Sequence, residues 1–218
     1  MKSSRGAAEL RPSSVRKRES MLAAAQEQFL ANGYDAVTMD SIAQASGVAK
    51  QTLYSHFGGK EGLFLELVGS QTRAASERVL GEPPLLAPGV DARSVLAPIL
   101  EQQLSIVLTP GLLALRRLVI GLLPQFPDLA RSLHLHGPQR AIDSLAEVLV
   151  RLDAAGSLRV PEPVLAATQL NWLVMGEPIN RAMLLGDDEA LPDVDVATQV
   201  GCGLDVFLAA YSVDAARA

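Results

Sequence analysis

Apolar residues at helical spacing are the feature that most limits the folds open to this chain. Across most of its 218 residues, apolar side chains recur three and four positions apart. Runs of alternating β-branched and polar residues, which would predict half-buried strands, are nearly absent from the sequence. Because 49% of the residues are hydrophobic, such helices carry enough apolar surface for one large core or two modest ones. The sequence therefore predicts an all-α protein.

A cluster of helix-breaking residues predicts where the chain divides. Gly81-Glu82-Pro83-Pro84 is followed closely by Pro88-Gly89, and no other stretch is as dense in glycine and proline. We place the domain boundary there. The resulting segments are a flexible basic arm over 1–13, an N-terminal domain over 14–80 that includes a connecting fourth helix, and a helical domain over 81–218.

Start and stop signals place the individual helices. In the N-terminal domain we expect helices over 14–32, from 38 to 46, over 49–56 and from 60 toward 80. In the second domain we expect them near 93–108, 110–123, 127–136, 138–155, 161–185 and 193–212. Three prolines fit the first turn of a helix, where no amide proton is needed: Pro110, Pro138 and Pro161. The acidic run 187–189 is interpreted as a solvated loop.

Charge and cysteine content narrow the functional classes. The chain has 19 basic and 24 acidic residues, and its net charge of -5 argues against a nonspecific nucleic-acid coat or a membrane-surface protein. Residues 1–80 nevertheless carry ten basic against eight acidic side chains. Cys202 is the only cysteine, which excludes an intrachain disulfide. Because the basic N-terminus lacks an apolar signal core and 112–123 is too short to span a bilayer, we expect a cytoplasmic protein without membrane contact.

Residues 38–57, TMDSIAQASGVAKQTLYSHF, have the pattern of a helix-turn-helix. Ile42 and Leu53 fall on the inward face of two short helices that a glycine-containing turn separates. The outward face of the second helix is rich in hydrogen-bonding side chains, which duplex recognition requires for phosphates and base edges. This outward set consists of Lys50, Gln51, Thr52, Tyr54, Ser55 and His56.

At these residues the sequence resembles the TetR family of one-component transcriptional regulators. The resemblance covers about residues 14–68. It rests on Ala25, Phe29, Gly33-Tyr34, Thr38, Ile42-Ala43, Ser46-Gly47-Val48, Thr52-Leu53-Tyr54, His56-Phe57, Lys60-Glu61 and Leu63. In the second domain, Phe126-Pro127-Asp128-Leu129 and Gly137-Pro138 resemble AefR-type C-terminal domains.

The resemblance implies a role for each matching residue. Thr38 would cap the second helix where it approaches the DNA backbone, and Lys50 and Gln51 would face bases or nearby phosphates. The remaining implied phosphate contacts are Thr52, Tyr54, His56 and Lys60. Two interpretations of Gln51 stay open, a base reader or an ordinary exposed glutamine. The same holds for the basic residues 16–18, which either bind DNA or form a solvated face.

The second domain offers weaker signals for a ligand site. The candidate lining residues are Arg116, Phe126, Asn171, Trp172 and Met175. The alternative is that the charge reaches solvent and the polar groups are satisfied within a helical core. His134 and His136, two positions apart on a helix, point to opposite sides, so we expect no metal site and no cofactor.

Taken together, we expect a homodimeric regulator that binds palindromic operator DNA, and the resemblance implies that it represses transcription until a small, largely apolar effector releases it. Helices near 161–185 and 193–212 are expected to form the dimer interface. One alternative is a ligand-binding or protein-interaction module without DNA binding. Another is a small helical enzyme, although no nucleophile elbow, phosphate loop or metal constellation supports it.

Overall fold

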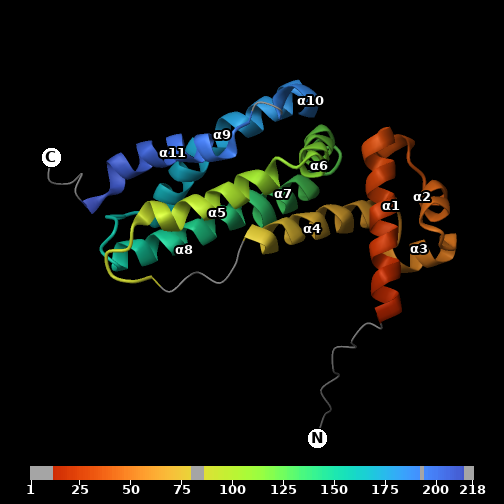
Figure 1. Cartoon of the computed structure of the whole chain (residues 1–218). Coiled ribbons are helices and arrows are strands. Elements are labelled where there is room, and N and C mark those ends of the chain that lie inside the picture. Colours follow the sequence, from red (N-terminus) through yellow and green to blue (C-terminus); the bar gives the residue numbers. More distant parts are fainter. Residues whose placement is uncertain (1–11, 80–85, 192–193, 214–218) are drawn as a thin grey trace, which may run out of the picture. The chain divides into compact units, whose positions relative to one another are not determined.

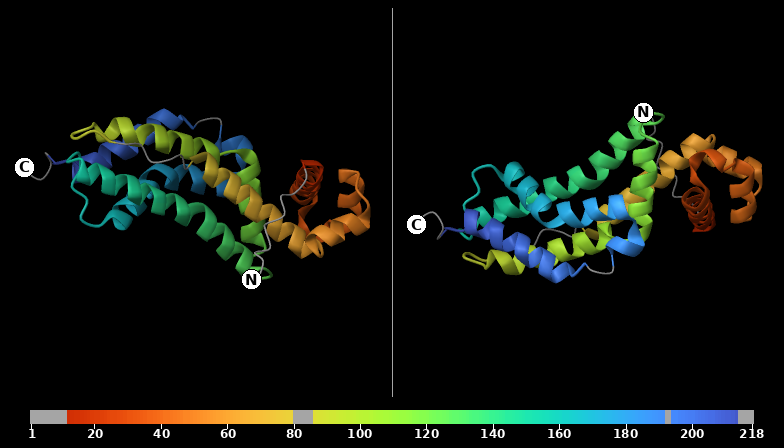
Figure 2. Two further views of the ribbon diagram at one scale, coloured as in Figure 1. Left: turned by 90° about the horizontal axis from the view of Figure 1, so that it is seen from below. Right: turned by 90° about the horizontal axis from the view of Figure 1, so that it is seen from above.

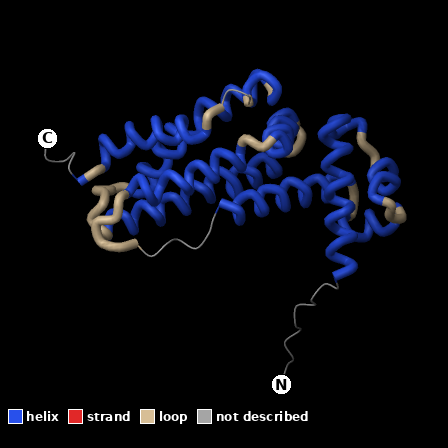
Figure 3. The backbone as a smooth tube through the Cα atoms, viewed as in Figure 1, coloured by secondary structure: helices blue, strands red, loops and turns tan. Residues whose placement is uncertain are grey.

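The computed structural model describes residues 12–79, 86–191 and 194–213 (Figure 1). These residues form helices joined by short loops, and the described part contains no strand beyond one isolated bridge between Leu158 and Ser212 (Figure 3). The predicted all-α class is confirmed. The chain divides into two compact units, Met1–Val68 and Gly69–Ala218.

The first unit contains three helices and the beginning of a fourth. They are α1 (Pro12–Ala36), α2 (Met39–Ser46), α3 (Lys50–Phe57) and α4 (Lys60–Val79). The first helix begins two residues before the predicted position, so residues 12 and 13 belong to α1 rather than to an arm, and residues 1–11 lie outside the described part. Gly33 interrupts the helical dihedral angles of α1 with φ of 75°, which confirms its predicted role at the end of this helix.

Three aromatic rings form the centre of the first unit. Phe29 lies 5.6 Å from Tyr34 and 5.0 Å from Phe64, and Tyr34 and Phe64 are also 5.0 Å apart, measured between ring centroids. All three side chains are buried. Phe29 and Tyr34 come from α1, on either side of the interruption at Gly33, and Phe64 comes from α4, so the cluster holds these two helices together. Ile42 of α2 and Leu53 of α3 are fully buried as well.

The division between the units falls inside α4, twelve residues before the predicted boundary at residue 81. The reason is packing. Thr72, in the second half of α4, is buried. A Cβ atom added to Gly137 would lie only 3.3 Å from the methyl group of Thr72. The second half of this helix therefore packs against η1, at Gly137, within the second unit. Residues 81–85 of the predicted boundary lie outside the described part of the chain.

The second unit contains the six helices that the sequence predicts, with end points that shift by a few residues, and two further short helical segments at 135–139 and 187–190. They are α5 (Ala92–Val107), α6 (Pro110–Gly121), α7 (Pro127–His134), the π-helix η1 (Leu135–Gln139), α8 (Arg140–Ala154), α9 (Pro163–Leu185), α10 (Asp187–Ala190) and α11 (Val196–Tyr211). The core lies among α5, α8, α9 and α11, and Figure 2 shows α9 and α11 (blue) running beside each other. Leu100, Leu104 and Phe207 are among its fully buried side chains.

Side-chain caps fix where several helices begin. Thr38 accepts a hydrogen bond from the amide of Ser41 at the start of α2, and Asp91 accepts bonds from two amides at the start of α5. Asp195 accepts hydrogen bonds from the amide and the hydroxyl of Thr198 at the start of α11, and these bonds lower the pKa of that carboxyl below its usual value. Each cap satisfies amide groups that the helix itself leaves without a partner.

Three sequence predictions in the second unit are wrong in detail. Pro138 lies inside η1 rather than in a first turn, and Pro161 precedes α9, whose first turn uses Pro163 instead. The acidic run is not a solvated loop: it forms the short helix α10, in which Asp187 is half-buried and pairs with Arg117 at 2.9 Å. Arg117 lies on α6, 70 positions earlier in the chain, so the local pattern of residues around Asp187 could not reveal this partner.

Within the described residues, no single helix has both the length and the apolar character needed to cross a membrane. The bent pair α5 and α6, with 63° between them, meets that requirement only when the two are taken together.

Candidate DNA-binding surface and candidate effector cavity

The α2–α3 turn positions the candidate DNA-binding helix. The capping box at Thr38 and Ser41 is closed in both directions, with Ser41 Oγ accepting from the Thr38 amide at 3.3 Å. Gly47 ends α2 in the left-handed region, at φ of 69°, and its amide bonds to the carbonyls of Ala43 and Gln44. The left-handed conformation is accessible to glycine without strain, and it turns the chain sharply into α3.

The exposed face of α3 carries the predicted polar set. Leu53 is fully buried and anchors the helix, while the outward residues of the predicted set are exposed except Thr52, which is half-buried. Tyr54 is 43% exposed, so its ring stands against solvent rather than in the core. The arrangement offers hydroxyl, amide, imidazole and ammonium groups on one side of a short helix. Their contact with DNA stays a prediction.

Lys50 has an intramolecular partner at the start of this face. Its Nζ lies 2.7 Å from Asp40 Oδ1, and both side chains are well exposed. The hydrogen bond that Lys50 donates to Asp40 raises the pKa of Lys50, with a smaller Coulombic contribution from the same carboxylate. An exposed pair of this kind is weak and exchanges readily. Lys50 is therefore available to a phosphate, but in competition with Asp40.

Lys60 has three hydrogen-bond acceptors within the first unit. Its Nζ donates to the carbonyl oxygens of Tyr34 at 2.9 Å, Asp35 at 3.3 Å and Val37 at 3.0 Å. It also lies 4.4 Å from the centre of the Tyr34 ring. An ammonium group has three protons to donate, and in this arrangement all three are directed at carbonyls. The group thus closes the turn between α1 and α2 and leaves no proton for a phosphate.

Of the basic residues before the motif, Arg18 is paired with Glu66 of α4, whereas Arg16 and Lys17 are exposed. The three basic residues 16–18 therefore do not share one interpretation. Arg18 belongs to the packing of α1 against α4 within the first unit. Arg16 and Lys17 keep both interpretations, a solvated face or a DNA contact.

A glycine that the sequence analysis passed over also shapes this unit. A Cβ atom built on Gly62 would lie 2.0 Å from the carbonyl oxygen of Phe57, far inside contact distance. The end of α3 and the first turn of α4 approach each other closely only because this position has no side chain. Gly62 falls inside a helical pattern, where glycine is unfavourable. This conflict was the one sequence signal that could have indicated the close approach.

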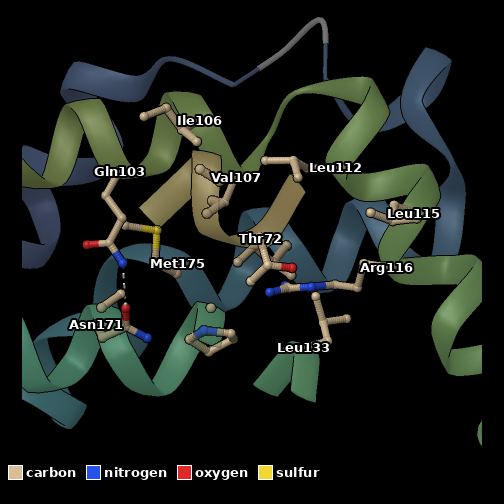
Figure 4. Close-up of a pocket in the computed structure, with 15 residues that line it drawn as sticks. Thr72, Gln103, Ile106, Val107, Leu112, Leu115, Arg116, Leu133, Asn171 and Met175 are labelled. Atoms are coloured by element: carbon tan, nitrogen blue, oxygen red, sulfur yellow. Dashed lines mark hydrogen bonds between the residues drawn. The ribbon is translucent and has the colours of Figure 1, made fainter. Parts of the chain in front are cut away.

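The second unit contains a cavity with a mostly apolar lining (Figure 4). Fifteen residues line it, from α4, α5, α6, α7, η1, α8 and α9, and only four of them are polar. The polar residues are Thr72, Gln103, Arg116 and Asn171. Gln103 Nε2 donates to Asn171 Oδ1 at 3.1 Å, and both of these amide side chains are buried. An apolar hollow with a few fixed polar groups is typical of sites for small organic molecules.

The structure brings three of the five predicted ligand residues to this cavity. Arg116, Asn171 and Met175 line it, but Phe126 and Trp172 do not. Trp172 follows Asn171 directly, so the helix turns its side chain about 100° away from the cavity, where it is 63% exposed. Phe126 precedes α7 and is half-buried outside the lining. Trp172 is therefore a poor reporter of binding in the cavity.

An exposed apolar strip lies along α9 and α11 instead. Trp172, Leu173 and Val206 are 63%, 39% and 58% exposed, and together with Phe207 and Tyr211 they line a shallow groove. Beneath the strip the two helices pack closely, since a Cβ on Gly203 would lie 2.7 Å from a methyl group of Val174. Apolar patches of this kind mark interaction surfaces.

Family models match both parts of the chain. Residues 21–67 match the model described as bacterial regulatory proteins, tetR family. Residues 94–213 match the model described as AefR-like transcriptional repressor, C-terminal domain. The second match alone covers more than half of the chain.

Solved structures and curated relatives agree with these matches. A TetR-family transcriptional regulator from Mesorhizobium loti MAFF303099 is 30% identical, with a TM-score of 0.84 over 94% of this chain and 100% of that chain. The flavonoid-responsive regulator FrrA is 32% identical, with a TM-score of 0.74 over 91% of this chain and 98% of that one. The transcriptional regulator TcmR of Streptomyces glaucescens is 33% identical over 129 residues, which are 56% of each chain. The chain thus spans about half the length of TcmR, and about a quarter of the next two curated relatives.

Proposed function

Because this chain belongs to the TetR family of helix-turn-helix transcriptional regulators, we propose that it acts as a homodimeric repressor on palindromic operator DNA. A small effector bound in the cavity of the second unit releases it from that DNA. The observation that carries the DNA-binding half is the face of α3, on which polar side chains are exposed while Leu53 anchors the helix in the core.

The proposed contacts follow from the chemistry of that face. Gln51 presents an amide, which pairs with a base edge, and lies in the first turn of α3, the part of a recognition helix that reaches bases. The phosphate contacts are Thr38, Lys50, Thr52, Tyr54 and His56. Lys60 is removed from this set, because its three protons are directed at carbonyls. It acts instead as a positioning residue that holds the turn before α2.

The proposed dimer interface is the apolar strip on α9 and α11. A second copy of the chain offers the same strip, so two-fold pairing would cover Trp172 and Val206 of both protomers at once. Paired in this way, two recognition helices require two half-sites with matching symmetry. Trp172→Glu should give monomers in sedimentation, because it places a charge in an interface that is otherwise apolar.

The proposed route from effector to DNA runs through α4. This helix begins at Lys60 in the first unit, and Thr72 and Ala75 in its second half line the cavity. A ligand that binds more tightly to the arrangement unable to bind DNA must weaken operator affinity, and by linkage DNA must weaken ligand binding by the same factor.

The test is a titration of labelled DNA from upstream of the protein's own gene with the protein. Fluorescence anisotropy measures the binding at several salt concentrations. We expect Gln51→Ala to lose discrimination of about 1–3 kcal/mol at particular base pairs. Equal affinity of the wild-type protein for the upstream DNA and for unrelated duplexes would contradict operator recognition. Full binding of a monomer to one isolated half-site would contradict the dimer.

A further inference from the structure

Two neighbouring arginines on α6 have opposite environments. Arg117 Nη1 donates to the carbonyl oxygen of Ala182 at 3.0 Å and pairs with Asp187 Oδ1 at 2.9 Å. Arg116 lines the cavity, and Figure 4 shows its guanidinium extending inward toward Thr72. Within the described part of the chain, the Arg116 guanidinium has neither an ion-pair partner nor a hydrogen-bond acceptor.

Among the described residues around Arg116, none balances its charge. Among the described residues that line the cavity, none is acidic, and eleven of the fifteen are apolar. Burial lowers the pKa of Arg116. Arginine nevertheless stays protonated at neutral pH, so the cavity holds a fixed positive charge.

Such a charge is unfavourable for the empty protein. Removing a guanidinium from water without a compensating anion costs stability, and a well-packed apolar side chain of similar size would avoid that cost. Stability alone therefore does not account for arginine at position 116. A ligand that brings the missing anion does, because five N–H donors in a planar fork match the two oxygens of a carboxylate.

We propose that the cavity takes a monoanionic amphipathic ligand, an apolar body with one carboxylate that binds Arg116. This inference refines the proposed function by naming the chemical class of the effector. The apolar body packs against aliphatic residues such as Leu112, Leu115 and Met175. The Gln103–Asn171 amide pair is buried beside it and offers a neutral hydrogen-bonding group to a polar atom elsewhere on the ligand.

The test compares matched acids and amides by isothermal titration calorimetry on the full chain at pH 7. The probes are 2-naphthoate against 2-naphthamide and 4-phenylbutyrate against 4-phenylbutanamide. For the wild-type protein we expect an acid to bind about tenfold or more tightly than its amide, since the bond to a guanidinium is charge-assisted. Arg116→Met should remove this preference, and Arg116→Lys should retain part of it because the charge remains without the fork.

Arg140→Met is the matched control. Arg140 is exposed at the start of α8 and does not line the cavity, so this variant changes the net charge equally and should leave the preference for acids intact. Three results would overturn the proposal: amides that bind as tightly as acids, acid binding that Arg116→Met leaves unchanged, or no binding of either acid up to about 1 mM.

A second measurement separates this proposal from the proposed function. Upstream DNA is titrated by anisotropy with and without the bound acid. If an acid binds through Arg116 and the affinity for DNA does not change, the proposed class of ligand is supported. The proposal that the ligand releases the protein from DNA is then contradicted. If DNA binds with sequence specificity and no acid enters the cavity, the regulator stands and the ligand class is wrong.

Discussion

One cation in each unit illustrates how differently the two units use charge. Lys60, in the first unit, directs its three protons at the carbonyls of residues 34, 35 and 37. Arg116, in the second, extends into an apolar cavity and finds no acceptor among the described residues. The lysine lies in a motif whose matching residues imply a DNA contact, and the arginine lies in a region without such a motif. Availability for a ligand is decided by the acceptors within reach rather than by position in a motif.

The comparison extends to the surfaces around the two cations. On α3, polar side chains point outward from a buried Leu53. Around the cavity, four polar side chains point inward from an aliphatic wall. The first arrangement suits a large charged partner that approaches from solvent, and the second suits a small molecule that leaves water on binding.

The largest effect is expected for Gly62→Ala. This variant tests whether the stability of the first unit depends on the close approach of α3 and α4 as well as on its charged groups. The new Cβ would overlap the Phe57 carbonyl oxygen, so α3 and α4 must separate. We expect a loss of about 3 kcal/mol in the free energy of unfolding, with loss of specific DNA binding. Chemical denaturation measures the first quantity and anisotropy the second.

Gly69→Ala is its control within the same helix. There the added Cβ would meet only the far end of the Arg73 side chain, at 3.1 Å. Since alanine favours helix more than glycine does, this variant should be neutral or slightly stabilising. Equal losses for the two variants would contradict the role assigned to the close approach at Gly62.

The next effect sharpens the comparison at Lys60. Lys60→Met leaves the carbonyls of Tyr34, Asp35 and Val37 without their shared donor, and we expect it to destabilise the protein by about 1–3 kcal/mol. The slope of log binding constant against log salt should stay unchanged. Lys50→Met should show the reverse, a small change in stability and a slope lower by about one unit. A reduced slope for Lys60→Met would restore Lys60 as a phosphate contact.

A smaller effect tests the charge in the cavity. Arg116→Met removes an unpartnered cation from an apolar site, and we expect a rise in melting temperature of about 2–4 °C without ligand. Arg117→Met should lower the melting temperature, because it leaves Asp187 without its cation. Differential scanning calorimetry measures the melting temperatures of both variants. A fall for both would mean that Arg116 stabilises the folded chain.

The smallest effect concerns the exposed Lys50–Asp40 pair on the proposed DNA-binding surface. Asp40→Asn releases Lys50 and removes a negative charge near the phosphates, so operator affinity should rise about two- to fivefold at low salt. The gain should disappear at high salt. The double variant that also carries Lys50→Met is the control, and a full gain in that background would show that release of Lys50 is not the cause.

The sequence by itself determined the local features of this protein. Helical spacing of apolar residues, the Thr38 cap and the glycine at position 47 predict α2, its turn and α3, because each depends on atoms a few residues apart. The same periodicity separates the buried Leu53 from the exposed side of α3. The exposed position of Gln51 and Tyr54 was predictable for that reason.

Only the tertiary structure decided which groups are free to bind. The acceptors of Lys60 lie 23 to 26 positions earlier in the chain, and the partner of Arg117 lies on α10. Asn171 and Trp172 are adjacent in sequence, yet one faces the cavity and the other solvent. Hydrogen bonds and ion pairs act over a few ångströms in space and are independent of distance along the chain. The pattern of residue types therefore predicted where helices form, and the packing of those helices determined which charges remained without a partner.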